Sequence, residues 1–276
     1  MSALPEPARS WQARLALGFA PVAGRTVIAR REQCGPLTVQ KALHPEGAPA
    51  HVYLLHPPGG LVGGDTLDIA LDAAPGSHAL VTTPASGKVY RSAGPRARQD
   101  LRIAVDNDAC LEWLPQDTIL FDGSDFAQRT AIDLGADARL VAREMIALGR
   151  PAHSDRYARG RLDQALLIRR AGRTLLEERL RLVAPSNLLA APWGLGGATV
   201  FGALYACPAG HAALDAVRAL AAAPLRAAAT LFDDLLCLRV LGDDASALRD
   251  YLAQAWAAVR EAVVGVRPCP PRVWRT

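Results

Sequence analysis

The segment His56-Pro-Pro-Gly-Gly-Leu-Val-Gly-Gly-Asp65 and the segment that follows it, Leu67-Asp-Ile-Ala-Leu-Asp72, together decide the fold. Glycine reaches backbone conformations that a β-carbon blocks, so four glycines and two prolines within ten residues indicate a sharply bent connection. The alternation of apolar and polar residues in the second segment is typical of a half-buried β-strand. We therefore expect a tight bend that leads into a strand.

The same period of two dominates from Trp11 to about Val183. Turn residues such as Pro75-Gly76, Asp106-Asn107-Asp108 and Gly135 interrupt it at short intervals. Many short strands at such spacing favour a mainly β body over a sheet with alternating helices. We expect one domain over residues 11–276, preceded by a mobile tail over residues 1–10.

The last quarter of the chain carries a different pattern. Residues 209–223 place their apolar side chains on one helical face, and residues 225–232 and 235–241 read as a hairpin. Asp243 and Asp244 are typical N-cap residues for a second helix, and Gly265 is a typical residue to end it. Two helices near the C-terminus are therefore expected.

Composition excludes several functional classes. The net charge is only +4, and no run of lysines and arginines exceeds two residues, so the chain has no electrostatic footprint for nucleic acid. No apolar stretch reads as a signal peptide or a membrane span, so we expect a soluble cytoplasmic protein without a membrane partner. The five cysteines form no CxxC pair, which argues against a structural zinc site.

Further motifs follow the glycine-rich bend in a fixed order. Thr82-Thr-Pro-Ala-Ser-Gly-Lys-Val-Tyr-Arg91 contains Lys88, one of only two lysines. The motifs that come after it are Leu111-Glu-Trp-Leu-Pro-Gln-Asp-Thr-Ile-Leu-Phe121, Glu144-Met-Ile-Ala-Leu-Gly-Arg-Pro-Ala152, Glu178-Arg-Leu-Arg-Leu182 and Pro271-Arg-Val-Trp274. In this order they strongly resemble the urease accessory protein UreD family, also called UreH, from about Trp11 to Thr276.

The resemblance implies a non-catalytic maturation factor. Proteins of this family bind apo-urease and recruit UreF and, through the complex, the GTPase UreG, so that Ni²⁺ is delivered to the dinickel site. It also implies a mainly β fold, with strands stacked in a helix-like arrangement and two helices.

The residues themselves favour ion transit over ion storage. The six histidines form no HxH or HxxxH pair, so we expect no tightly bound metal or other cofactor. Carboxylates and hydroxyls along a polar internal passage suit a cation that binds only transiently. The candidates for a transient nickel path are Asp65, Thr82, Thr83, Glu144 and Glu178.

Each candidate also has a structural interpretation. Asp65 is typical of a turn carboxylate that accepts nearby N–H groups, and Thr82 and Thr83 are ordinary strand residues. Glu144 and Glu178 are equally consistent with interior pairing to an arginine or to Lys88, which we expect to be buried or at an interface. The glycine-rich segment matches neither nucleotide-binding loop motif.

Partner contacts are expected where arginine and aromatic anchors occur, because such residues are enriched at the centres of interfaces. The candidates are Lys88, Arg150, Trp256, Arg272 and Trp274. The two tryptophans are also consistent with closing the core.

Three functions remain open on these residues. The first is a scaffold that guides Ni²⁺, the second is a purely mechanical adaptor that carries no metal, and the third is a β-rich hydrolase. The hydrolase would use Asp65 with Glu144 or Glu178 as an acid–base pair.

Overall fold

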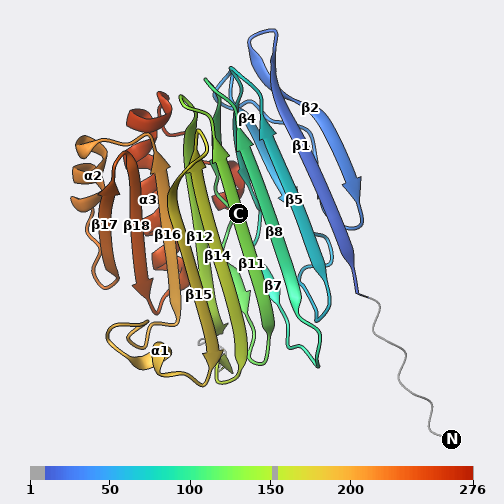
Figure 1. Cartoon of the computed structure of the whole chain (residues 1–276), viewed down its shortest axis with the longest axis vertical. Coiled ribbons are helices and arrows are strands. Elements are labelled where there is room, and N and C mark those ends of the chain that lie inside the picture. Colours follow the sequence, from blue (N-terminus) through green and yellow to red (C-terminus); the bar gives the residue numbers. More distant parts are fainter. Residues whose placement is uncertain (1–9, 151–154, 276) are drawn as a thin grey trace, which may run out of the picture.

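The computed structural model of the chain describes residues 10–150 and 155–275 (Figure 1). Two large β-sheets make up most of the molecule, and helices pack on one of them. The mainly β fold expected from the sequence is therefore confirmed. The tail expected over residues 1–10 lies, apart from Ser10, outside the described residues.

The first sheet has seven strands. Its spatial order is β15 (Arg173–Ala184), β14 (Gly160–Arg170), β11 (Asp125–Leu134), β8 (Ala97–Val105), β5 (Thr66–Ala73), β1 (Gln12–Val22) and β2 (Arg25–Cys34). The five strands from β14 to β1 are parallel, and each outer strand pairs antiparallel with its neighbour.

The second sheet has eleven strands. Its main path is β17 (Arg226–Phe232), β18 (Leu235–Gly242), β16 (Val200–Cys207), β12 (Arg139–Arg150), β9 (Cys110–Trp113), β6 (His78–Thr82), β4 (Ala50–Leu55) and β3 (Thr38–Val39). The short strands β10 (Thr118–Leu120) and β13 (Asp155–Arg156) pair with β12, and β7 (Gly87–Val89) pairs with β10.

The chain alternates between the two sheets as it advances. β5, β8, β11 and β14 belong to the first sheet, whereas β6, β9 and β12, which come between them in sequence, belong to the second. Successive parallel strands are thus joined through a strand of the opposite sheet rather than through a helix. This winding produces the stacked, solenoid-like arrangement, and it explains the period of two, because each strand buries one face between the sheets.

The core has two parts. Leu15, Leu17, Ile69 and Leu101 are among the fully buried residues that fill the space between the sheets. The second part lies between the eleven-stranded sheet and two helices, α2 (His211–Arg218) and α3 (Ala245–Val264), and its largest buried side chain is Trp256. Figure 1 shows α2 and α3 beside β16, β17 and β18, at the side of the molecule opposite β2.

Both predicted C-terminal helices and the hairpin between them are present. The Asp244 carboxylate accepts hydrogen bonds from the N–H groups of Ser246 (2.8 Å) and Ala247 (3.1 Å), and Gly265 ends α3 in the left-handed conformation. α2 is shorter than the predicted 209–223, and the structure adds a four-residue helix, α1 (Asn187–Ala190), and a 3₁₀ turn at Arg272–Arg275.

Candidate functional site

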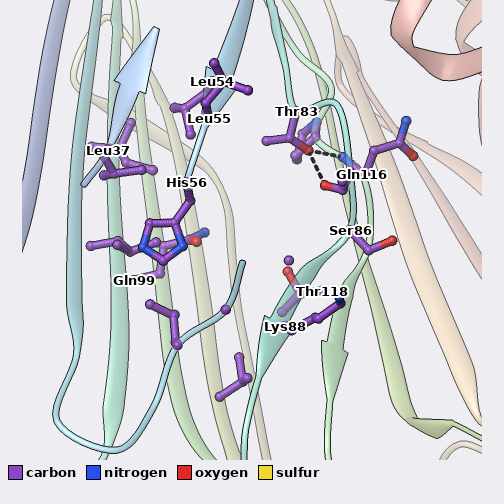
Figure 2. Close-up of a pocket in the computed structure, with 18 of the residues that line it drawn as sticks. Leu37, Leu54, Leu55, His56, Thr83, Ser86, Lys88, Gln99, Gln116 and Thr118 are labelled. Atoms are coloured by element: carbon purple, nitrogen blue, oxygen red, sulfur yellow. Dashed lines mark hydrogen bonds between the residues drawn. The ribbon is translucent and has the colours of Figure 1, made fainter. Parts of the chain in front are cut away.

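Two cavities lie along the space between the sheets, with volumes of about 320 and 400 Å³. The first is lined by His56, Thr83, Gln99 and Gln128 among others, and Figure 2 shows His56 and Gln99 on one side of it and Thr83, Ser86 and Thr118 on the other. The second is lined by Gln164, Glu178, Tyr205 and Arg239 among others. Glu144 lines both cavities, so the two cavities approach one another at this residue.

Strand register explains how the polar groups around Glu144 come together. On the eleven-stranded sheet, Glu144 of β12 pairs with Ala203 of β16, which in turn pairs with Arg239 of β18. On the seven-stranded sheet, Thr130 of β11 pairs with Leu166, and Leu166 pairs with Glu178 of β15. The two rows face one another, because Thr130 reaches Glu144 and Arg239 reaches Glu178.

Glu144 is a buried carboxyl held by neutral groups. Thr130 Oγ1 donates to its Oε1 at 2.6 Å, and Gln164 Nε2 donates to its Oε2 at 2.8 Å. Burial raises the pKa of Glu144, although both hydrogen bonds oppose that shift. Within the described part of the chain no arginine, lysine or histidine forms an ion pair with it, so the interpretation as half of an interior ion pair is wrong for this residue.

Glu178 has the opposite environment. Its carboxylate forms an ion pair with Arg239 and accepts a hydrogen bond from Tyr205 Oη at 2.7 Å. Burial raises the pKa of Tyr205, so its hydroxyl remains a donor at neutral pH. Glu178 therefore pairs with an arginine as expected, although the pair is partly exposed rather than interior, and the second cavity contains one charge-balanced carboxylate.

The side-chain oxygens of the remaining three candidates form hydrogen bonds mainly with backbone groups. Thr83 lines the first cavity, and its hydroxyl accepts from Gln116 N at 2.9 Å and donates to Ala85 O at 3.1 Å, as Figure 2 shows. Thr82 is fully buried outside the lining of both cavities and donates to Leu114 O at 2.5 Å.

Asp65 also lies outside the lining of both cavities. Its Oδ1 accepts from Trp11 N at 2.7 Å and its Oδ2 from Val62 N at 2.8 Å, which confirms the interpretation as a turn carboxylate. The loop from His56 to Asp65 joins β4 to β5 as expected. It requires glycine, because Gly64 has φ +94° and a β-carbon at residue 63 would lie 2.4 Å from Ser92 Oγ.

Several polar residues of the cavities were not among the sequence candidates, among them His56, Gln128, Gln164 and Arg239. Gln128 and Gln164 occupy positions of β11 and β14 whose neighbours two residues away are buried. A polar residue at a position where the alternating pattern places apolar residues was the sequence feature that could have identified these two glutamines. Nothing comparable marked Arg239, because the arginine content of the chain is high throughout.

The partner-contact candidates divide into exposed and buried groups. Lys88 is exposed on β7, so of the two positions expected for it, buried or at an interface, the buried one is wrong, and Arg272 is exposed as well. Arg150 is partly exposed, with its Nε 3.1 Å from Asp155 Oδ2 and its guanidinium 4.2 Å from the centre of the Phe121 ring. These three side chains remain available to a partner.

Trp256 and Trp274 close the core beneath the C-terminal segment. Trp256 is fully buried and donates to Glu112 Oε2 at 2.7 Å, and its ring meets that of Trp274 edge-on at 5.3 Å. Trp274 donates to Thr82 Oγ1 at 2.9 Å and stacks with the guanidinium of Arg143. The structural interpretation therefore accounts for Trp256, whose side chain has no surface to offer a partner.

Two searches of the described residues bear on metal and membrane binding. His, Cys, Asp and Glu side chains do not gather there in groups of three or more suited to a metal ion. The helices found in those residues are too short or too polar to cross a membrane.

Comparison with known proteins identifies the family. Residues 12–275 match the family model described as UreD urease accessory protein. The chain belongs to the UreD family. Three relatives carry the name urease accessory protein UreD. The one from Alkalilimnicola ehrlichii is 48% identical and is aligned over 96% of this chain and 92% of its own length.

The other two relatives are similarly close to full length. The UreD protein from Pseudomonas entomophila is 41% identical over 99% of this chain and 97% of its own. The one from Citrobacter koseri is 43% identical over 97% of this chain and 93% of its own. The resemblance drawn from the ordered motifs is therefore confirmed across the chain.

Proposed function

We propose that this UreD-family chain is a non-catalytic maturation factor that binds apo-urease, recruits UreF and, through the complex, UreG, and lets Ni²⁺ pass through its interior toward the dinickel site. Family membership supports an accessory role in association with urease. The observation that carries the ion passage is Glu144, a buried carboxyl that lines both cavities and has no cationic partner among the described residues.

A cation that enters a protein interior loses hydration, and a carboxylate without a counter-ion can compensate for that loss. The side-chain amides of Gln128 and Gln164 and the hydroxyl of Thr130 donate to the Glu144 carboxyl, so the groups beside it are polar but uncharged. One carboxylate with neutral neighbours binds a divalent ion only loosely, which is what transit requires.

Glu178 provides the next carboxylate along the same rows of residues. Its pairing with Arg239 means that an ion must compete with a guanidinium for the carboxylate oxygens. Such competition shortens the stay of the ion in the second cavity. Transit through two weak positions agrees better with the two cavities than does storage in one tight site.

The hydrolase alternative is less well supported by the geometry. Both Asp65 oxygens accept backbone N–H groups, and Asp65 does not line the cavities that Glu144 lines. An acid–base pair must act on one substrate from the same cavity.

The experiment that tests the proposal separates assembly from activation. Glu144→Gln and Glu178→Gln are each co-purified with the urease subunits and the other accessory proteins, and urease activity is then measured against added nickel. We expect normal complexes and activation reduced by about tenfold or more at limiting nickel, the size of effect common when a group that orients a metal is lost.

Asp68→Asn is the matched control, because it makes the same chemical change on the outer face of β5, where Asp68 pairs with Arg102. Normal activation in both glutamine variants, with normal complexes, would favour the mechanical adaptor and remove the ion passage.

A further inference from the structure

His56 contributes an imidazole to the first cavity, and its Nε2 is buried without a hydrogen-bond partner among the described residues. Figure 2 shows the ring at the wall of the cavity, beside Gln99. A buried polar atom that makes no hydrogen bond costs free energy, so packing alone does not explain it. Nε2 therefore offers an unused lone pair or proton in the wall of the first cavity.

The ring sits on a rigid base. His56 opens the glycine-rich loop and Asp65 closes it, and Asp65 is tied by hydrogen bonds to the backbone of Trp11 and Val62. Burial lowers the pKa of His56 and the nearby Asp65 carboxylate opposes that shift only in part. The imidazole is neutral at neutral pH, and a neutral imidazole is a common ligand of transition metals.

Resting on the passage proposed above, we propose that His56 Nε2 is a ligand for Ni²⁺ in the first cavity, the place where the ion first exchanges a water molecule for a protein nitrogen before it reaches Glu144. In the lining of the first cavity, Thr83, Gln99 and Gln128 offer neutral oxygen groups. The remaining ligands of the ion are thus waters, and binding stays weak.

A single nitrogen ligand also gives selectivity. Mg²⁺ and Ca²⁺ prefer oxygen ligands, whereas Ni²⁺ binds imidazole well. A passage lined only by carboxylates and amides would admit the hard cations as readily as nickel. His56 would favour Ni²⁺ at the entrance and leave the deeper carboxylate to act without discrimination.

The first test is spectroscopic and needs neither partners nor activity. The full, untagged chain is prepared with isotope-labelled histidine rings, and NiCl₂ is added stepwise while the six imidazole signals are followed by NMR. The signal missing in His56→Gln is that of His56. We expect this signal to broaden at the lowest Ni²⁺ concentration, before the others, and to stay unmoved in MgCl₂.

His211→Gln is the control variant, since His211 is exposed at the start of α2. It should leave the broadening of the His56 signal unchanged. Uniform broadening of all six signals, or first broadening at a different histidine, would overturn the proposal. The order of broadening is measured on the wild-type protein. If His56→Gln does not fold, through-bond correlations assign the His56 ring signal instead.

The second test uses the complete activation complex. With His56→Gln we expect the nickel concentration for half-maximal activation to rise about tenfold, with the maximum retained at high nickel. An unchanged nickel dependence, together with impaired activation in Glu144→Gln, would remove the role of His56 and leave the passage in place. Unchanged activation in all the cavity variants would instead remove the proposed function itself.

Discussion

Glu144 brings a carboxyl into the molecule without an ionic partner in the described chain, and this has a consequence for stability. Burial holds its pKa above the value of the unfolded chain, so the folded protein retains this proton more strongly. The contribution of Glu144 to stability is fully present below the unfolded pKa and is lost as the pH rises through the raised folded pKa. Above that pKa the folded protein bears the cost of a buried charge.

Glu144→Gln removes this cost and keeps an acceptor for Thr130. At pH 8 the variant should be more stable than the wild type by about 1 kcal/mol, a common gain for one stabilising substitution, and the difference should shrink at pH 4. Urea unfolding at the two pH values measures it. Asp68→Asn on the outer face serves as the control, and an equal difference at both pH values would contradict the assignment.

Sequence motifs located Thr83, Glu144 and Glu178 because chemistry and position coincide in those residues. They could not separate Asp65 and Thr82, whose oxygens bind backbone groups of loops that are distant in sequence. His56 belongs to the glycine-rich motif, but the sequence does not mark it as a site residue, because a nitrogen without a hydrogen-bond partner is a property of three-dimensional packing. A sequence pattern shows which face of a strand a side chain occupies, but it does not show which groups lie opposite that side chain in the fold.

At the scale of elements, α3 is held to the second sheet by a buried charged network. Arg260 of α3 is fully buried, and its Nη2 lies 2.9 Å from Glu112 Oε1 and 2.7 Å from Glu46 Oε1. His78 and Trp256 also donate to Glu112. Burial raises the pKa of Glu112, but the hydrogen bonds and charges of His78 and Arg260 hold it below its usual value. The pKa of Glu46 falls to about 2 for similar reasons.

Glu112→Gln should therefore be strongly destabilising. It leaves Arg260 buried with half of its compensation, and breaking a buried pair typically costs about 3 to 5 kcal/mol. The free energy of urea unfolding measures this cost. Glu261→Gln makes the same change on the exposed face of α3 and should alter stability by less than about 0.5 kcal/mol. A cost for Glu112→Gln no larger than that of the control would contradict the anchoring role.

A helix or strand could be predicted where its sequence signal acts on adjacent residues. Both ends of α3 were predictable, because the caps at Asp244 and Gly265 act on adjacent backbone groups. The sequence pattern does not predict β16, because both of its faces are buried: Ala203 and Tyr205 face the other sheet and Leu204 faces the helices. Its sequence is an apolar run without alternation. α1 is too short to show a helical period.

At the scale of the whole molecule, the two rows of residues place Ala203 between Glu144 and Arg239, on the line from the first cavity to the second. Ala203→Phe adds an aromatic ring to the second cavity, whose volume is about 400 Å³, without replacing an acidic residue. It should lower urease activation at limiting nickel while complexes still form.

Ala165→Phe is the size-matched control. Ala165 lies on β14 between Gln164 and Leu166 in sequence, so its side chain points to the outer face of the seven-stranded sheet. Activation titrated against nickel, with co-purification as the measure of assembly, compares the two variants. Equal activation by both phenylalanine variants would argue against transit through the second cavity.

The mainly β class and the order of elements could be predicted from the sequence, but the winding of the chain could not. Alternation is the same whether a strand pairs with its neighbour in sequence or with a strand one full turn away. The pairing of Thr130 with Leu166, which aligns Thr130 with Glu178 across β14, depends on the register of β11 with β14, two segments that β12 and β13 separate in the chain. The cavities arise only from that stacking.

The outermost strands of the seven-stranded sheet have a consequence for how copies of the chain meet. β2 and β15 reverse direction at the two ends of the parallel stack, and both are rich in arginine: Arg25, Arg30, Arg31, Arg173, Arg179 and Arg181. Open strand edges invite another sheet to join, and charged side chains discourage it. An incoming strand would have to cover these charged side chains, which disfavours growth into filaments and directs association to other surfaces.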